Sequence, residues 1–252
     1  MIGAIAGDII GSRFEFENHR SRDFELFAGE ASFFTDDTVL TIATARWLLD
    51  GENLTDVVID TFKRYPNVSY GGSFAAWALR GGGEPYGSYG NGSAMRVSPV
   101  AYAARDEMDC LSLAEESAAV THNHPEGIKG AQATAWATWM ALQGHTGPSI
   151  KAGIEDRFGY DMQRDWFSGY DFDVTCQGTV PPALICALDA TSYEDFIRSA
   201  VSIGGDTDTI CAIGGAVAEA LFGVPDEIAS QALERLDDYM LGIVGRFKEK
   251  FG

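Results

Sequence analysis

The sequence predicts an all-α domain, because three observations agree. Apolar and small residues recur with a spacing of about 3.6 throughout the chain, which is typical of helices. No segment shows a sustained alternation of apolar and polar residues, so strand signals are nearly absent. A chain of 252 residues with 46% hydrophobic content can build one sizeable core. We therefore expect roughly ten or more helices in a single domain covering residues 1–252, without repeats.

The helices of the first half are marked by their start and stop signals. Small apolar residues open the chain, and Gly3, Gly7 and Gly11 are spaced so that a helix could approach a neighbouring backbone closely. Residues 19–34 lack periodicity and are expected to form a long surface loop, a length that is often functional. Glycine at 51 and proline at 66 mark helix ends. The expected helices are Ile2–Ile10, Thr35–Asp50, Leu54–Tyr65 and Ser73–Leu79.

The second half continues in the same manner. A glycine-dense loop spans residues 81–92, and residues 159–174 form an irregular aromatic stretch. We expect Pro181 and Pro182 in the first turn of a helix, where proline is tolerated. A flexible diglycine, Gly204-Gly205, precedes a largely apolar helix that reaches Phe222. The other expected helices are Leu111–Val120, Ile128–Leu142, Ile150–Phe158, Ala183–Leu188, Tyr193–Val201 and Asp226–Lys248.

The charge and the cysteines exclude several classes of protein. The formal net charge of −19 disfavours nucleic acids and anionic membranes, which are bound through lysine and arginine. The four cysteines form no C-x-x-C pair, so neither a zinc ribbon nor a disulfide framework is indicated. The apolar N-terminal run lacks the basic region of a signal peptide, and no apolar segment is long enough to span a membrane. We expect a cytoplasmic monomer.

Two clusters of acids carry the strongest chemical signal. Thr35-Asp36-Asp37-Thr38 and the pair Asp206 and Asp208 with Thr209 both open helices that are too apolar to be exposed. Taken singly, each cluster could simply cap a helix. Taken together, so many buried carboxylates require a counterion. Oxygen ligands of this kind suit Mg²⁺ or Mn²⁺, and two such ions could share carboxylates if the clusters meet in space.

Three weaker signals accompany the acids. His122 and His124 precede Pro125, where a hydrogen-bonded turn is as consistent with the pattern as a ligand site. The glycines around Asn91 would permit close backbone approach to a ligand, and an anion could bind at the helix start that follows. The aromatic residues Tyr170 and Phe172 could stack on a purine or could cover the core.

Five segments resemble one family in order and spacing. They are G-A-I-A-G-D-I-I-G-S-R-F-E from Gly3, F-T-D-D-T-V-L-T from Phe34, G-N-G-S-A-M-R from Gly90, T-H-N-H-P-E from Thr121 and G-G-D-T-D-T from Gly204. The family is that of the ADP-ribosylglycohydrolases, which includes the dinitrogenase reductase-activating glycohydrolases. The resemblance spans nearly the whole chain, and the combination of T-D-D with a distal D-x-D-T is specific.

The resemblance implies a compact multi-helix orthogonal bundle with a centre of two Mg²⁺ or Mn²⁺ ions. It implies catalytic roles for Glu15, Asp36 and Asp206, with Glu15 as the general base or as the group that steers the attacking water. The implied metal ligands are Thr35, Asp36, Asp37, Asp206, Asp208 and Thr209. The implied substrate-binding residues are Asn91, Gly92, Ser93, Met95, His122 and His124, to which the stacking candidates Tyr170 and Phe172 are added.

The expected activity is metal-dependent hydrolysis of the glycosidic bond at C1 of the distal ribose in an ADP-ribosylated protein or small molecule. Arginine-directed members of the family carry an aspartate shortly before G-N-G, whereas Glu84 is the nearest acid here. This difference leaves arginine, serine, an acetyl ester or a free metabolite open as the acceptor. The alternatives are a non-catalytic ADP-ribose-binding or structural member of the fold, or a Mg²⁺-dependent phosphohydrolase in which D-x-D-T follows a strand.

Overall fold

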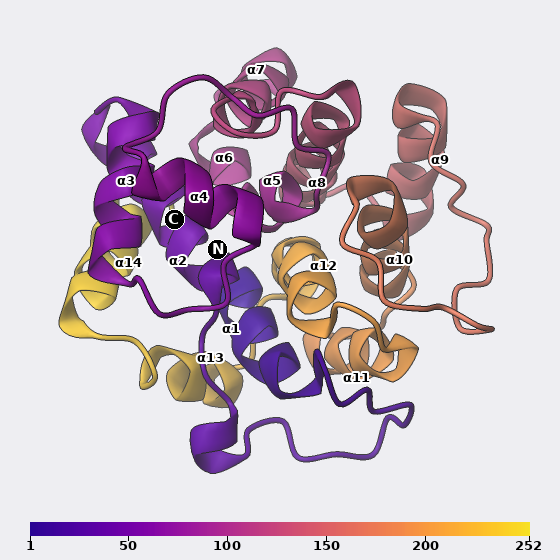
Figure 1. Ribbon diagram of the computed structural model, residues 1–252. Coiled ribbons are helices and arrows are strands. Elements are labelled where there is room, and N and C mark those ends of the chain that lie inside the picture. Colours follow the sequence, from indigo (N-terminus) through magenta and orange to yellow (C-terminus); the bar gives the residue numbers. More distant parts are fainter.

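The computed structural model describes residues 1–252 and confirms the all-α prediction, with a single isolated bridge between Gly90 and Thr175 in place of any sheet. Figure 1 shows the helices packed around a central pair, α1 and α12. The fourteen helices are α1 (Ile2–Gly11), α2 (Asp36–Asp50), α3 (Leu54–Arg64), α4 (Gly72–Leu79), α5 (Gly92–Met95), α6 (Ser98–Ala103), α7 (Glu107–Ala119), α8 (Pro125–Leu142), α9 (Gly147–Phe158), α10 (Cys176–Leu188), α11 (Tyr193–Ile203), α12 (Thr207–Phe222), α13 (Asp226–Leu233) and α14 (Asp238–Phe251).

The central pair is held together by glycines. An added Cβ at Gly3, Gly7 or Gly11 would lie within 2.5 Å of a backbone oxygen of α12, so each position accepts only glycine at this helix separation. The prediction that these three glycines permit close approach is therefore confirmed. The contact also sets the register of the two helices, since Gly11 lies against Thr207 and Asp208. The carboxylates of α1 and of the α12 start are thereby brought to the same end of the pair.

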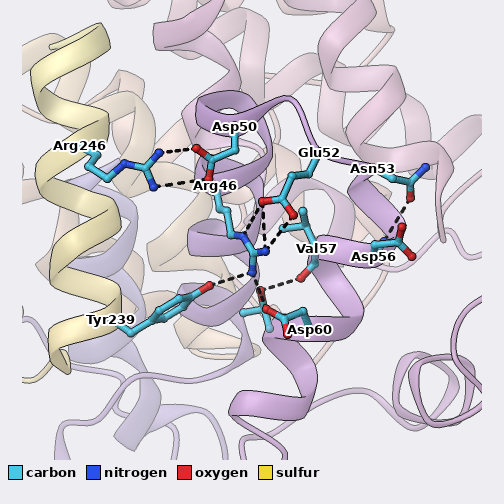
Figure 2. A network of polar contacts seen from close by, with 10 residues as sticks. Arg46, Asp50, Glu52, Asn53, Asp56, Val57, Asp60, Tyr239 and Arg246 are labelled. Carbon is cyan, nitrogen blue, oxygen red and sulfur yellow. Dashed lines mark hydrogen bonds and ion pairs between the residues drawn. The ribbon is translucent and has the colours of Figure 1, made fainter.

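Helix α2 places the T-D-D segment at the same end. Thr35 is the N-cap of α2 and accepts a hydrogen bond from the backbone N–H of Asp37, and Gly51 ends the helix in the left-handed conformation with φ of 67°. Farther along α2, Arg46 pairs with Glu52 and Asp60 from the start and middle of the α3 region (Figure 2). These surface ion pairs lie at the opposite end of α2 from Thr35.

Two predictions about helix boundaries are wrong. Helix α10 begins at Cys176, so Pro181 and Pro182 lie inside it rather than in its first turn. Proline at 182 has no N–H to donate to the carbonyl of Gly178, four residues earlier. The Tyr170 hydroxyl donates to that carbonyl at 3.0 Å instead, so a tertiary contact compensates for the missing bond.

The second error concerns the C-terminal region. The expected helix Asp226–Lys248 is divided into α13 and α14, because Asp237 caps α14 by accepting from the backbone N–H of Met240. Leu236, in the break, is buried. The short helix α6 was not anticipated; it begins at Ser98 with proline in its first turn.

The interior is one continuous hydrophobic cluster, which reaches from α1 to α14. Cys110, Cys176, Cys186 and Cys211 are buried free thiols, in agreement with the absence of a predicted disulfide framework. None of the fourteen helices combines the length and the apolar character that spanning a membrane requires.

Candidate active site

The two predicted acid clusters meet at the end of the α1–α12 pair. Carboxylate oxygens of Asp8, Asp37 and Asp208 lie within 4.8 Å of one another, and so do those of Glu15, Asp206 and Asp208. Asp208 belongs to both groups and joins them. The Thr209 hydroxyl donates to Asp37 Oδ2 at 3.4 Å, which links the α12 start directly to the α2 start. Segments about 170 positions apart in the chain thus form one acidic site.

Asp8 is the residue of this cluster that the sequence analysis did not single out as a site residue. Its carboxylate is fully buried and accepts four hydrogen bonds, from the backbone N–H and hydroxyl groups of Thr35 and Thr38. It therefore fixes the first turn of α2, on which Asp36 and Asp37 are carried. The sequence signal that could have identified Asp8 is a single aspartate in an otherwise apolar helix, next to Gly7, which packs against α12.

Asp206 is held in place by Asn91 of the glycine loop rather than by residues of α2. It is the N-cap of α12, and its Oδ2 accepts from Asn91 Nδ2 at 2.6 Å. Asn91 Nδ2 also donates to Thr179 Oγ1 at 3.1 Å, so α10 supports the same amide. The predicted ligand-loop residue Asn91 thus connects the glycine loop to the acid cluster.

Burial and mutual repulsion disfavour the charged forms of these acids. Burial raises the pKa of Asp8 and the pKa of Asp206 to about 6. Burial, followed by the charges of Asp208 and Asp8, raises the pKa of Glu15 to about 8. Burial, followed by the charges of Asp208 and Asp8, raises the pKa values of Asp36 and Asp37 well above the usual range for aspartate. Burial, followed by the charge of Asp206, does the same to the pKa of Asp208. Without a counterion the cluster would hold protons near neutral pH.

The donor set fits a divalent cation. None of the ion pairs of the structure involves these carboxylates, so no lysine or arginine neutralises them. Asp37 Oδ1 is buried and has no hydrogen-bond partner in the protein. Buried carboxylate and hydroxyl oxygens are the ligands that Mg²⁺ and Mn²⁺ prefer. The cluster is therefore suited to hard divalent ions, as its residue types predict.

A cavity of about 340 Å³ opens above the acids. The glycine loop and the start of α4 also contribute to its lining. Ten of the predicted site residues line it, namely Glu15, Asp36, Asp37, Asn91, Gly92, Met95, His122, Asp206, Asp208 and Thr209. A cavity lined by both carboxylates and glycine-rich backbone can hold a ligand that carries both hydroxyl and phosphate groups.

Glu15 reaches the cavity from the turn that follows α1. The helix ends at Gly11, and a 3-10 turn from Ser12 to Phe14 delivers Glu15 at its C-cap. The Glu15 carboxylate lies close enough to that of Asp8 for the charge of Asp8 to raise its pKa, although the α-helix does not continue to Glu15. Its half-buried carboxylate borders both the acids and the cavity.

Five predicted site residues do not line the cavity, and each has another contact. Thr35 lies behind the acids, where it caps α2 and donates to Asp8. The Ser93 hydroxyl donates to the carbonyl of Gly127, and His124 caps α8 through Nδ1. Tyr170 is buried with its hydroxyl on α10, and Phe172 stacks at 6.2 Å on Phe16, next to Glu15.

Sequence reasoning missed a second group of lining residues. The start of α4 contributes Gly71, Gly72 and Ser73, of which only Ser73 was named above, as the first residue of a short helix. Arg96, the last residue of G-N-G-S-A-M-R, also borders the cavity although it is only 1% exposed. A fully buried arginine beside a ligand cavity could have been suspected from its position in that motif.

The fold and the site define an all-helical protein with a cluster of carboxylates, suited to divalent cations, beneath a ligand cavity. The sequence model of a family described as ADP-ribosylglycohydrolase matches residues 1–251, and the chain belongs to that family. The membership confirms the family predicted from the five sequence segments, and with it the predicted class of enzyme, a hydrolase of ADP-ribosyl glycosidic bonds.

Individual relatives are distant but are matched over most of their length. The chain is 25% identical to the ADP-ribosylhydrolase ARH3 of Homo sapiens, in an alignment that covers 95% of this chain and 88% of the relative. It is 26% identical to the ADP-ribosylarginine hydrolase Tri1 of Pseudomonas putida (strain GB-1), with 89% of this chain and 70% of the relative covered. Identities this low do not show which acceptor group this protein's substrate carries.

A solved structure supports the fold. A chain of an "ADP-ribosylglycohydrolase-related protein complex" superposes with a TM-score of 0.74 at 24% identity, covering 100% of this chain and 97% of that one. In this fold Asp206 follows helix α11 and a short turn. The alternative of a phosphohydrolase whose first aspartate stands at the end of a strand therefore does not fit.

Proposed function

We propose that this protein hydrolyses the glycosidic bond at C1 of the distal ribose in an ADP-ribosylated protein or small molecule and releases ADP-ribose. The observation that carries the proposal is the joining of both acid groups through Asp208, directly beneath a cavity that Glu15 also borders. The family membership supports the bond type, and the cavity volume of about 340 Å³ suits a ligand of nucleotide size.

The proposed ligands for two divalent cations, Mg²⁺ or Mn²⁺, are the residues of the two helix starts. When bound, such ions would position ribose hydroxyls and lower the pKa of a coordinated water. Asp8 would keep the α2 start in place through its four hydrogen bonds from Thr35 and Thr38. The proposed ligand set is Thr35, Asp36, Asp37, Asp206, Asp208 and Thr209.

The remaining roles belong to the cavity wall. The Glu15 carboxylate would accept a proton from the attacking water, for which its position beside the acids and the cavity is suited. Asn91 would hold Asp206 through its side-chain amide, while the glycines on either side of it leave room for the diphosphate. His122, whose ring lies next to Gly90 and Gly92, would contact the ribose or the diphosphate.

The acceptor group is tested by substrate choice. Purified protein should be incubated with ADP-ribose linked to arginine, to serine and to acetate, with Mg²⁺, with Mn²⁺ and with EDTA, and released ADP-ribose should be measured. We expect release from at least one conjugate, and we expect EDTA to abolish it. Binding of ADP-ribose without release from any conjugate would instead support the non-catalytic alternative.

A further inference from the structure

Arg96 carries a positive charge that no carboxylate of the protein neutralises. The side chain is 1% exposed and takes part in none of the ion pairs. Its Nη2 donates to the carbonyl of Ser117 at 2.8 Å and to Thr121 Oγ1 at 2.9 Å, and its Nη1 is buried without a partner. Burying an unpaired guanidinium is unfavourable, so its retention beside the cavity requires an explanation.

Thr121 connects this charge to His122. Its hydroxyl is completely buried and lies 2.7 Å from His122 Nδ1. Arg96 has only donors, so the Thr121 oxygen must accept from it. The single hydroxyl proton of Thr121 then has one acceptor within reach, His122 Nδ1. If Nδ1 carried a proton instead, the Thr121 hydroxyl proton would be buried without an acceptor.

The proton of the neutral His122 ring is therefore on Nε2. That nitrogen faces the glycine loop, because an added Cβ would lie 3.2 Å from it at Gly92 and 3.7 Å from it at Gly90. Both glycines line the cavity together with His122. Burial and the charge of Arg96 lower the pKa of His122 well below its ordinary value, which agrees with an uncharged ring.

We propose that Arg96 and Thr121 are positioning residues that hold His122 as a neutral imidazole protonated on Nε2, so that it donates a hydrogen bond to an oxygen of the ADP-ribosyl ligand. The ligand part of this proposal rests on the proposed function, whereas the protonation of the ring does not. The arrangement supplies a hydrogen-bond donor to the cavity without placing a second positive charge next to Arg96.

The protonation of the ring can be observed directly by NMR. Protein labelled with ¹⁵N-histidine contains four histidines, and the His122 signals are assigned by comparison with the His122→Gln variant. In the Mg²⁺-loaded protein near neutral pH, we expect an unprotonated Nδ1 and a protonated Nε2 for His122. Thr121→Val should shift the ring toward a mixture of both tautomers, and Thr121→Ser should restore the original state.

The second readout is the affinity for ADP-ribose, measured by calorimetry. Thr121→Val should weaken binding about tenfold, as expected for one lost hydrogen-bonding arrangement, and Thr121→Ser should not. Thr138→Val is the matched control, because it also removes a buried hydroxyl, one bonded only within α8 to the carbonyl of Thr134.

Each contrary result would overturn a specific part of this proposal. A wild-type ring protonated on Nδ1 or on both nitrogens, or a Thr121→Val spectrum identical to wild type, would overturn the positioning role. A changed tautomer with unchanged affinity would overturn the donor role. Failure of the wild-type protein to bind ADP-ribose would contradict the proposed function and remove the donor role, while the NMR result would still decide the state of the ring.

Discussion

Two groups of acids lie at the two ends of helix α2, and they differ in whether basic side chains pair with them. At the C-terminal end, Asp50, Glu52 and Asp60 are neutralised by Arg46 and Arg246 at the surface (Figure 2). At the N-terminal end, Asp37 is buried with Asp8, Asp206 and Asp208 next to the half-buried Asp36 and Glu15, and no basic side chain pairs with any of them.

This difference in pairing indicates different roles: the ion-paired acids are structural, and the unpaired acids are available to bind a ligand. The paired acids retain contact with water, since the side chains of Glu52 and Asp60 are 44% and 51% exposed, and their ion pairs contribute little to stability. The unpaired acids are desolvated, and their mutual repulsion lowers the stability of the folded protein unless a cation binds them. Substitutions in the acid cluster should therefore lower activity without lowering the stability of the metal-free protein. Substitutions in the paired group should lower stability slightly and leave activity unchanged.

Among the substitutions considered, Asp208→Ala should change turnover the most, because Asp208 belongs to both carboxylate groups. Its loss should reduce ADP-ribose release by about a thousandfold or more, as expected when metal catalysis is lost. The metal-free variant should melt no lower than metal-free wild type, since like-charge repulsion is relieved. Asp60→Ala, in the paired group, is the control and should leave turnover unchanged. Comparable turnover of Asp208→Ala and wild type would remove the acid cluster from the mechanism.

Glu15→Gln should give the next largest effect. It removes the proposed base while keeping the size of the side chain, so turnover should fall by about 100-fold to 10,000-fold with metal binding retained. The exposed neighbour Glu17 provides a control, since Glu17→Gln should behave as wild type. Metal affinity and initial rates should be measured on the same preparations. Wild-type turnover in Glu15→Gln would assign Glu15 to packing alone.

The stability of the metal-free protein should depend on pH because of the unpaired acids. Aspartates and glutamates titrate at about pH 4 in an unfolded chain. The pKa of Asp8 and that of Asp206 are about 6 in the folded state, and that of Glu15 is about 8. Between these limits the folded state holds more protons than the unfolded state, so the free energy of unfolding falls as the pH rises.

The corresponding measurement is thermal unfolding after EDTA treatment. The melting temperature should be lower near pH 8 than near pH 5 by on the order of 5 °C, and saturating Mg²⁺ should remove most of this difference. Asp206→Asn, which eliminates one titrating group, should show a smaller pH effect. Equal melting temperatures at both pH values without metal would show that the acids are not electrostatically strained.

The smallest effect is expected in the paired group itself. Arg46→Met keeps the apolar stem and leaves Glu52 and Asp60 hydrated, so the free energy of unfolding should fall by only about 1 kcal/mol. That corresponds to a melting temperature lower by about 2–4 °C, with unchanged turnover. A loss of activity would show that the two ends of α2 are not independent.

Local patterns were sufficient to predict the parts of the site that lie on helix starts. The T-D-D and D-x-D-T segments carry start signals, and glycines at every fourth position predicted the close approach of α1 and α12 that brings Asp208 to Asp8. The all-α architecture followed from helical periodicity alone. These features depend on residues near one another in the chain.

The features that were missed depend on contacts between distant segments. Asp8 acts through threonines 27 and 30 positions away, so its spacing in α1 did not reveal its partners. Helix α10 tolerates its prolines because the Tyr170 hydroxyl satisfies a carbonyl that local rules leave unpaired. The position of Arg96 against Thr121 likewise arises only from packing.

The central claim is that the unpaired acids form a centre for divalent cations, and a calorimetric titration tests it most directly. EDTA-treated wild-type protein, titrated with Mn²⁺ near neutral pH, should bind two ions per chain, and Asp208→Ala should lose this binding, whereas Asp60→Ala should retain it. Absence of saturable Mn²⁺ binding to wild type, or equal binding by Asp208→Ala, would contradict the account.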